Sequence, residues 1–132
     1  MNGIILGVSG IAQHAGRILL AKRSRGPFAG CWSLPGGKVN PMERHRDALA
    51  REFLEETGLR IRVDRAAGIA EAIDPQRSWH YVILCYHVTA TGGELAAGDD
   101  AAEVAWASRE DFSRLPLTPH LESYLEEFKA WN

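Results

Sequence analysis

The stretch between Asn40 and Gly58 constrains the fold of this chain more than any other part of its sequence. Its seventeen residues are mainly Ala, Leu, Arg and Glu, with no glycine and with a single proline, Pro41, at the first position. Asn is favoured at helix N-caps, proline at the first helical position, and glycine just after a helix end. Glu43, three residues after Asn40, adds the second half of a capping box. The sequence therefore predicts a helix that starts at Asn40 and stops at Gly58.

Runs typical of β-strands lie on both sides of this helix, because they are rich in aliphatic, β-branched or aromatic residues. They are Ile4–Ile11, Arg17–Lys22, Trp32–Leu34, Ile61–Ile73, Trp79–Ala90 and Val104–Trp106. Turns are predicted at Gln13–Gly16 and Thr91–Gly93. The glycine- and proline-rich segment Arg25–Gly37 is predicted to be a loop that carries the short Trp32–Leu34 strand.

Two further helical segments are expected near the C-terminus. Ser108 is predicted to cap a helical turn. Thr118–Pro119 is predicted to begin a helix with Leu121, Leu125 and Phe128 on one face. Strands, a helix, more strands and terminal helices in this order predict an α/β fold, in which a sheet and helices form layers.

The composition limits the class of protein and of partner. A chain of 132 residues is predicted to form one domain, residues 1–132, and its 45% hydrophobic and 24% charged residues are typical of globular proteins. A net charge of −2 argues against binding to long nucleic acid. No run approaches the length of a membrane span, the N-terminus has no signal-peptide pattern, and Cys31 and Cys85 form no zinc or disulfide motif. A cytoplasmic protein without a membrane partner is therefore expected.

Three carboxylates fall on one face of the predicted helix. Glu52, Glu55 and Glu56 stand at positions i, i+3 and i+4, which are neighbours on a helix surface. Without further context, such a face is more often a solvated surface. Like charges repel there, and the candidates for compensation are Arg51 and a divalent cation such as Mg²⁺ or Mn²⁺. Mg²⁺ prefers carboxylate oxygens and pairs with phosphate oxygens, so a metal site would indicate a phosphorylated substrate.

The spacing around these glutamates decides between the two interpretations. From Gly37 to Leu59 the chain reads Gly-x5-Glu-x7-Arg-Glu-U-x-Glu-Glu-x-Gly-U, where U is apolar, and all nine fixed positions are met. A chance match at one site has a probability on the order of 10⁻⁹. This pattern is the Nudix box, and the chain resembles the Nudix hydrolase family. Leu34–Gly37, Arg23 and the segment from Asp99 to Trp106 also resemble family features.

The resemblance implies a fold, a reaction and a set of site residues. The fold is an α/β/α sandwich around a mixed β-sheet. The reaction is metal-dependent hydrolysis of the pyrophosphate bond in a nucleoside diphosphate linked to another moiety. By position, the family's metal ligands match Glu52, Glu55 and Glu56, its main-chain carbonyl ligand matches the region of Gly37, and its orienting partners match Arg51 and Glu43.

The resemblance also implies a further acidic residue near the last strand, as a metal ligand or a base. Glu103 is the best match, with Asp99 and Asp100 as alternatives. Glu52 or Glu103 is then the expected general base, and the choice between them stays open.

Three positions depart from common family patterns. Many members have Glu and Gly where this chain has Asn40 and Met42. Asn40 is explained as the helix cap. Phe53 is bulkier than the usual aliphatic residue and is expected to pack beneath the helix.

Substrate choice depends on residues outside the box. Arg23 and Arg25 are expected to meet a phosphate or a terminal ribose. Trp32 and Tyr81 are expected to contact the substrate, and further candidates for stacking on a base are Phe28, Trp79 and His80. Pro75 lies sixteen residues after Leu59, a placement that resembles the ADP-ribose-cleaving branch of the family.

The expected partner is therefore a small-molecule nucleotide, with ADP-ribose or a nucleotide sugar preferred. One alternative is a nucleotide-pool-sanitising triphosphatase. An alternative of another class is a non-catalytic nucleotide-sensing module, against which the complete set of box glutamates argues. The sequence leaves a homodimer open.

Overall fold

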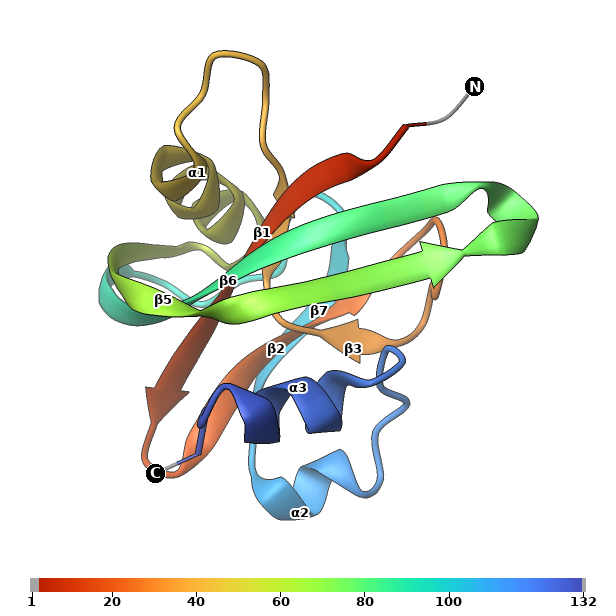
Figure 1. Cartoon of the computed structure of the whole chain (residues 1–132). Coiled ribbons are helices and arrows are strands. Elements are labelled where there is room, and N and C mark those ends of the chain that lie inside the picture. The colour runs from red at the N-terminus through yellow and green to blue at the C-terminus, as the bar shows by residue number, and fades with distance from the viewer. Residues whose placement is uncertain (1–2, 132) are drawn as a thin grey trace.

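A computed structural model describes residues 3–131 of the chain. A seven-stranded sheet lies at the centre, with helices on both sides (Figure 1). The elements in chain order are β1 (Ile5–His14), β2 (Arg17–Arg23), β3 (Trp32–Ser33), β4 (Gly36–Lys38), α1 (His45–Thr57), β5 (Leu59–Asp74), the 3₁₀ helix η1 (Pro75–Arg77), β6 (Trp79–Gly93), β7 (Ala101–Ala107), α2 (Arg109–Phe112) and α3 (Leu121–Glu127). Within residues 3–131, no helix is both long enough and apolar enough to cross a membrane.

The sheet combines parallel and antiparallel pairs. Its main path runs β3-β2-β1-β6-β5, with β4 paired to β1 and β7 paired to β2. β1 and β6 are parallel over a register that runs from Ile5 opposite Tyr81 to Ala12 opposite Val88. The other pairs are antiparallel. The predicted α/β fold with a mixed sheet is confirmed.

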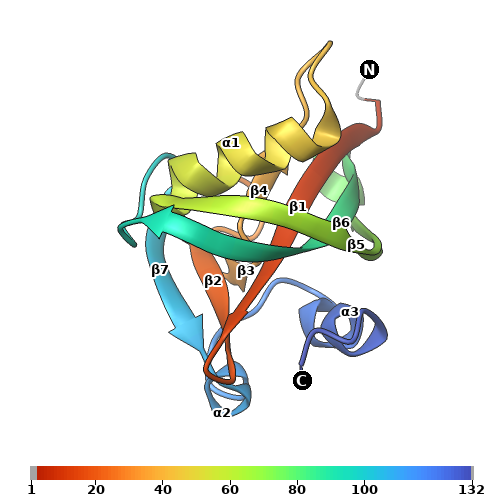
Figure 2. The same ribbon diagram turned by 90° about the vertical axis from the view of Figure 1, so that its left-hand side faces the viewer.

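Hydrophobic side chains pack against both faces of the sheet. Figure 2 shows α1 on one side, and α2 and α3 on the other. The side chains of β2 alternate between these two layers: Leu19 belongs to the core beneath α1, and Ile18 and Leu20 belong to the core beneath α2 and α3. All three are fully buried. Because successive side chains point to opposite faces of the sheet, helices pack on both faces. The fold therefore has three layers: α1, the sheet, and α2 with α3.

The bulk of Phe53 is accommodated by a glycine in the sheet. Phe53 is fully buried in the core beneath α1, as predicted. A Cβ atom at Gly10 would lie 3.1 Å from the Phe53 ring, so the ring fills the space left by the missing side chain. The pair thereby sets how closely α1 approaches β1.

The helix begins later than the sequence predicts. α1 starts at His45, and its N-cap is Arg44, whose side chain makes no capping hydrogen bond. Before it the chain turns, and the Glu43 N–H donates to the Asn40 carbonyl. Met42 in this turn has a φ of +66°, a left-handed conformation that interrupts a right-handed helix. The prediction of Asn40 as N-cap is therefore wrong.

The end of the helix agrees with the prediction, but the turn predicted near the end of β6 does not. Gly58 is the left-handed C-cap of α1. Thr91–Gly93 is predicted to turn the chain, and this is wrong, because these residues belong to β6, and Gly92 and Gly93 pair with the first residues of β5. The register of the long β5–β6 hairpin overrides the local preference of two glycines for a turn.

Part of the predicted loop before α1 is a strand. Gly36–Lys38 forms β4, antiparallel to β1. A Cβ atom at Gly36 would collide with the Val8 carbonyl oxygen, so glycine is required for this approach. β4 therefore passes close to β1 on one side and to α1 on the other.

The C-terminal helices follow the prediction in part. Ser108 and Asp111 form a reciprocal capping box at the start of α2, which confirms the predicted cap. α3 starts at Leu121 rather than at Thr118–Pro119, since the Thr118 N–H donates to the Trp32 carbonyl of β3. Leu121 is buried in one cluster with Leu125 and Phe128, as expected for the apolar face.

Met42 offers a direct test of the turn before α1. We expect Met42→Gly to raise the free energy of unfolding by about 1 kcal/mol, because glycine adopts a positive φ without the steric cost of a Cβ atom. Met42→Ala is the matched control, since it removes the exposed side chain and keeps the Cβ atom. Urea denaturation compares the three proteins, and a Met42→Gly variant no more stable than Met42→Ala would contradict the prediction.

Candidate active site

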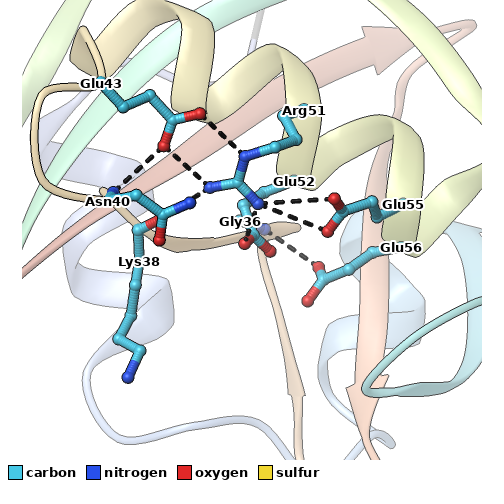
Figure 3. A network of polar contacts seen from close by, with 8 residues as sticks. All are labelled: Gly36, Lys38, Asn40, Glu43, Arg51, Glu52, Glu55 and Glu56. Carbon is cyan, nitrogen blue, oxygen red and sulfur yellow. Dashed lines mark hydrogen bonds and ion pairs between the residues drawn. The ribbon is translucent and has the colours of Figure 1, made fainter.

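Arg51 organises the carboxylates around α1 (Figure 3). Its Nε donates to Glu43 Oε2 at 2.8 Å and its Nη2 to Glu43 Oε1 at 2.9 Å, which makes a bidentate pair. The same Nη2 donates to the Lys38 main-chain carbonyl at 3.1 Å. Nη1 donates to Glu52 Oε1 at 2.8 Å and lies 3.4 Å from a Glu55 carboxylate oxygen. One guanidinium group therefore joins the turn before α1, the end of β4 and the face of the helix.

Glu56 is enclosed between α1 and β4. Its Oε1 accepts a hydrogen bond from the Gly36 N–H at 3.1 Å. Burial raises the pKa of Glu56 to about 8, and the favourable effects of Gly36 and Arg23 offset only part of that rise. A nearby cation would stabilise the ionised form of this carboxylate, which burial disfavours.

Gly36, rather than Gly37, presents its main-chain groups to Glu56. β4 pairs with β1 so that Gly37 lies opposite Val8. The hydrogen bonds on either side show that these two residues are themselves a hydrogen-bonded pair. The N–H and C=O of one strand residue point the same way. The peptide groups of Gly37 therefore face β1, while those of Gly36 face α1. Sequence reasoning missed Gly36 because it treated this segment as a loop, in which no alternation is expected.

Glu52 and Glu55 differ in their surroundings. Glu52 lies against β4, where a Cβ atom at Gly37 would collide with its carboxylate. Burial raises the pKa of Glu52, although its hydrogen bond with Arg51 acts in the opposite direction. The side chain of Glu55 is 39% exposed. Among residues 3–131, no three His, Cys, Asp or Glu side chains converge on a single point, and Arg51 instead holds Glu52 and Glu55.

A cavity of about 830 Å³ opens beside these glutamates. Charged and aromatic side chains share its lining, and they include Lys22, Arg23, Arg25, Phe28, Glu52, Glu56, Trp79, Tyr81 and Asp100. This volume lies within the usual range for small-molecule sites. The combination suits a ligand that has both a charged part and a flat aromatic part.

Three of the four residues predicted to contact a substrate line this cavity. They are Arg23, Arg25 and Tyr81. The fourth, Trp32, is only 7% exposed and packs in the core beneath α3. Its main chain explains this position, because its N–H donates to the Pro116 carbonyl and its carbonyl accepts from the Thr118 N–H.

The acidic residues near the last strand are divided between two places. The side chain of Glu103 is 60% exposed and pairs with Lys22 at 3.2 Å. Asp100 lines the cavity and pairs with Arg25. Asp99, in a left-handed conformation, is one of the charges that raise the pKa of Glu52. The structure thus brings the loop at Asp99 and Asp100 toward the glutamates, whereas Glu103 is held by Lys22.

Comparison with known proteins points to one family. The sequence model of the NUDIX domain family matches residues 3–128 of this chain. An ADP-ribose pyrophosphatase of Methanocaldococcus jannaschii is 37% identical over 125 residues, which cover 94% of this chain and 72% of that protein. A CTP pyrophosphohydrolase of Escherichia coli is 36% identical over 124 residues, which cover 93% and 90%. The crystal structure of a MutT NUDIX hydrolase from Burkholderia pseudomallei matches with a TM-score of 0.83 and 35% identity, over 96% of this chain and 98% of that one.

The pair between Arg51 and Glu43 predicts how stability depends on acid. Hydrogen bonds from Arg51, and then from the Asn40 N–H, lower the pKa of Glu43 from its usual 4.5 to about 2. Because the pKa is lower in the folded state, the stabilisation is fully present above about pH 4.5 and is lost as the pH falls toward about 2. We expect the free energy of unfolding of wild type and Glu43→Gln to differ most above that pH and to converge below it.

Urea denaturation at a series of pH values measures this difference. Glu122→Gln, which changes an exposed carboxylate on α3 outside the Arg51 network, is the matched control. The difference in free energy of unfolding between Glu122→Gln and wild type should not show the same dependence on pH. If the gap between wild type and Glu43→Gln stayed constant into the acidic range, the pair would not lower the pKa of Glu43.

Proposed function

The chain belongs to the Nudix family of pyrophosphohydrolases, and from this premise we propose that it uses Mg²⁺ or Mn²⁺ to hydrolyse the pyrophosphate bond of a nucleoside diphosphate derivative. The Arg51 network carries the proposal, because it holds Glu52 and Glu55 beside the enclosed Glu56, and Glu52 and Glu56 line the cavity. A pyrophosphate group is itself strongly negative, so it binds next to carboxylates through cations.

The residues present fit a hard divalent cation. Glu52, Glu55 and Glu56 would supply carboxylate oxygens, and Gly36 would supply a main-chain carbonyl in place of the Gly37 carbonyl expected from the sequence. The space that Gly37 leaves for the Glu52 carboxylate supports this arrangement. When bound, such a cation neutralises charge on the diphosphate and lowers the pKa of a water molecule.

Glu52 is the general base in this proposal. Its carboxylate lines the cavity, and it is oriented by a hydrogen bond from Arg51. Arg51 is a positioning residue, which Glu43 holds in place. Glu103 is the second candidate for the base, but it does not line the cavity itself, and its carboxylate is engaged by Lys22, which does.

ADP-ribose or a nucleotide sugar is the substrate class that we propose first. The Methanocaldococcus jannaschii relative is named an ADP-ribose pyrophosphatase. Arg23 and Arg25 line the cavity, where Arg25 is suited to phosphate or ribose oxygens, and Tyr81 lines it as an aromatic contact. The Escherichia coli relative, named a CTP pyrophosphohydrolase, favours hydrolysis of a nucleoside triphosphate as the second candidate.

A substrate panel separates the two candidates. It contains ADP-ribose, UDP-glucose, dinucleoside polyphosphates and modified deoxynucleoside triphosphates, each assayed with Mg²⁺ and with Mn²⁺. We expect the highest kcat/KM with ADP-ribose, and AMP and ribose 5-phosphate as products. A higher kcat/KM with a triphosphate, giving a nucleoside monophosphate and pyrophosphate, would establish the second candidate. No metal-dependent hydrolysis of any compound would overturn the proposed function.

Substitution of single glutamates tests their roles. We expect Glu52→Gln and Glu56→Gln each to lower kcat by about 10²-fold or more, because one removes the base and the other a metal ligand. Glu56→Gln should also weaken Mn²⁺ binding measured by calorimetry without substrate. Glu103→Gln is the control and should change kcat by less than about fivefold, as for an exposed ion pair. An equal loss in Glu103→Gln and Glu52→Gln would move the base to Glu103.

A further inference from the structure

The aromatic wall of the cavity is built from two segments that are distant in the sequence. Trp79 is the first residue of β6, at the tip of the β5–β6 hairpin, which Figure 1 shows extending away from α1. Phe28 lies in the loop between β2 and β3, and the Phe28 and Trp79 ring centroids are 5.9 Å apart at an interplanar angle of 75°. The Tyr81 centroid is 4.2 Å from that of Trp79. All three rings line the cavity.

Trp79 is the tryptophan that faces the cavity beside the glutamates. The chain has four, and all lie within the described residues 3–131. Trp32 is buried in the core, Trp106 packs on the ring of His14, and Trp131 packs on another ring in the layer of α2. Among these four, the cavity lining contains Trp79 alone.

Arg23 connects the aromatic wall with the glutamates. Its guanidinium carbon lies 6.0 Å from the centre of the Trp79 ring. Its Nε donates to the carbonyl of Pro27, the residue before Phe28, at 2.8 Å. Arg23 also lines the same cavity as Glu52 and Glu56, so it lies between the aromatic wall and the proposed metal site. A nucleotide has the same order of parts, with a phosphate at one end and a flat base at the other.

We propose that Trp79 binds the nucleotide by stacking on its base, with the guanidinium group of Arg23 on the other face of the base. This inference rests on the proposed function, because it assumes that the glutamates receive the pyrophosphate. Aromatic rings and guanidinium planes both stack on bases. A base between two flat groups separates them by about 7 Å, twice a van der Waals contact. The present 6.0 Å is slightly less, and the flexible Arg23 side chain accounts for the adjustment.

The neighbours of Trp79 support this assignment. Tyr81 is already in ring contact with it, which fixes the orientation of the indole and leaves no space for a base between them. Phe28 contacts Trp79 edge-on and has a φ of +63°, a conformation rarely adopted by a bulky residue. Backbone strain of this kind is concentrated at ligand sites. The two residues hold Trp79 as a preformed platform.

Binding of AMP, compared with binding of ribose 5-phosphate, tests the role of Trp79. Neither compound contains a pyrophosphate bond, so neither is hydrolysed, and they differ by the base. We expect Trp79→Ala to weaken AMP binding by about tenfold or more and to leave ribose 5-phosphate binding unchanged. Trp79→Phe keeps a ring and should retain most of the AMP affinity. In steady-state assays of ADP-ribose hydrolysis, Trp79→Ala should raise KM far more than it lowers kcat.

Tryptophan fluorescence gives an independent signature. AMP should quench the emission of wild type and of the control variant Trp106→Phe, but not that of Trp79→Phe. Unchanged AMP binding in Trp79→Ala, an equal loss for both ligands, or quenching that persists in Trp79→Phe would overturn the assignment. Failure of the proposed function has a different signature, since the wild type would then hydrolyse no compound of the panel whether or not it binds AMP.

Discussion

The arrangement of the carboxylates around α1 depends on one guanidinium group. Three carboxylates on one helix face repel each other, and Arg51 offsets this by bonding to Glu52 and Glu55. Arg51 is held in turn by a bidentate pair with Glu43 and by the Lys38 carbonyl. Because Glu43 precedes α1 and Lys38 ends β4, these bonds also fix the helix against the sheet. The same interactions that position the site therefore stabilise the packing around it.

The glycines before the helix complete this arrangement by removing side chains. At Gly36, a Cβ atom would meet the main chain of β1, and at Gly37 it would meet the Glu52 carboxylate. β4 can therefore lie close to both β1 and α1, and the Gly36 N–H reaches Glu56. The spacing of the Nudix box has a physical meaning in these contacts, since it places Gly37 against Glu52 and Glu43 within reach of Arg51, which in turn holds Glu52 and Glu55.

The sequence predicts the part of the site that is local and misses the part that depends on register. The helix stop at Gly58 is confirmed because it depends on a local glycine signal, and the burial of Phe53 is confirmed because it follows from the apolar face of the helix. The helix start at Asn40 is wrong, since Met42 turns the chain, although Glu43 does accept the predicted hydrogen bond from the Asn40 N–H. Which glycine faces the glutamates depends on how β4 pairs with β1, and that pairing has no signal in the segment itself.

The residues proposed for the reaction are local in the sequence, whereas those proposed to contact the base are not. The glutamates lie on one helix, whereas Phe28 and Trp79 are brought together by the long-range pairing of β1 with β6 and by the loop after β2. A change in the hairpin tip or in that loop can alter what stacks in the cavity without disturbing the Arg51 network. The relatives named ADP-ribose pyrophosphatase and CTP pyrophosphohydrolase, 37% and 36% identical to this chain, show that similar overall identity accompanies different substrate names. Overall identity therefore reports on the reaction and not on the substrate, and our proposal places the base of the nucleotide at Trp79, outside the Arg51 network.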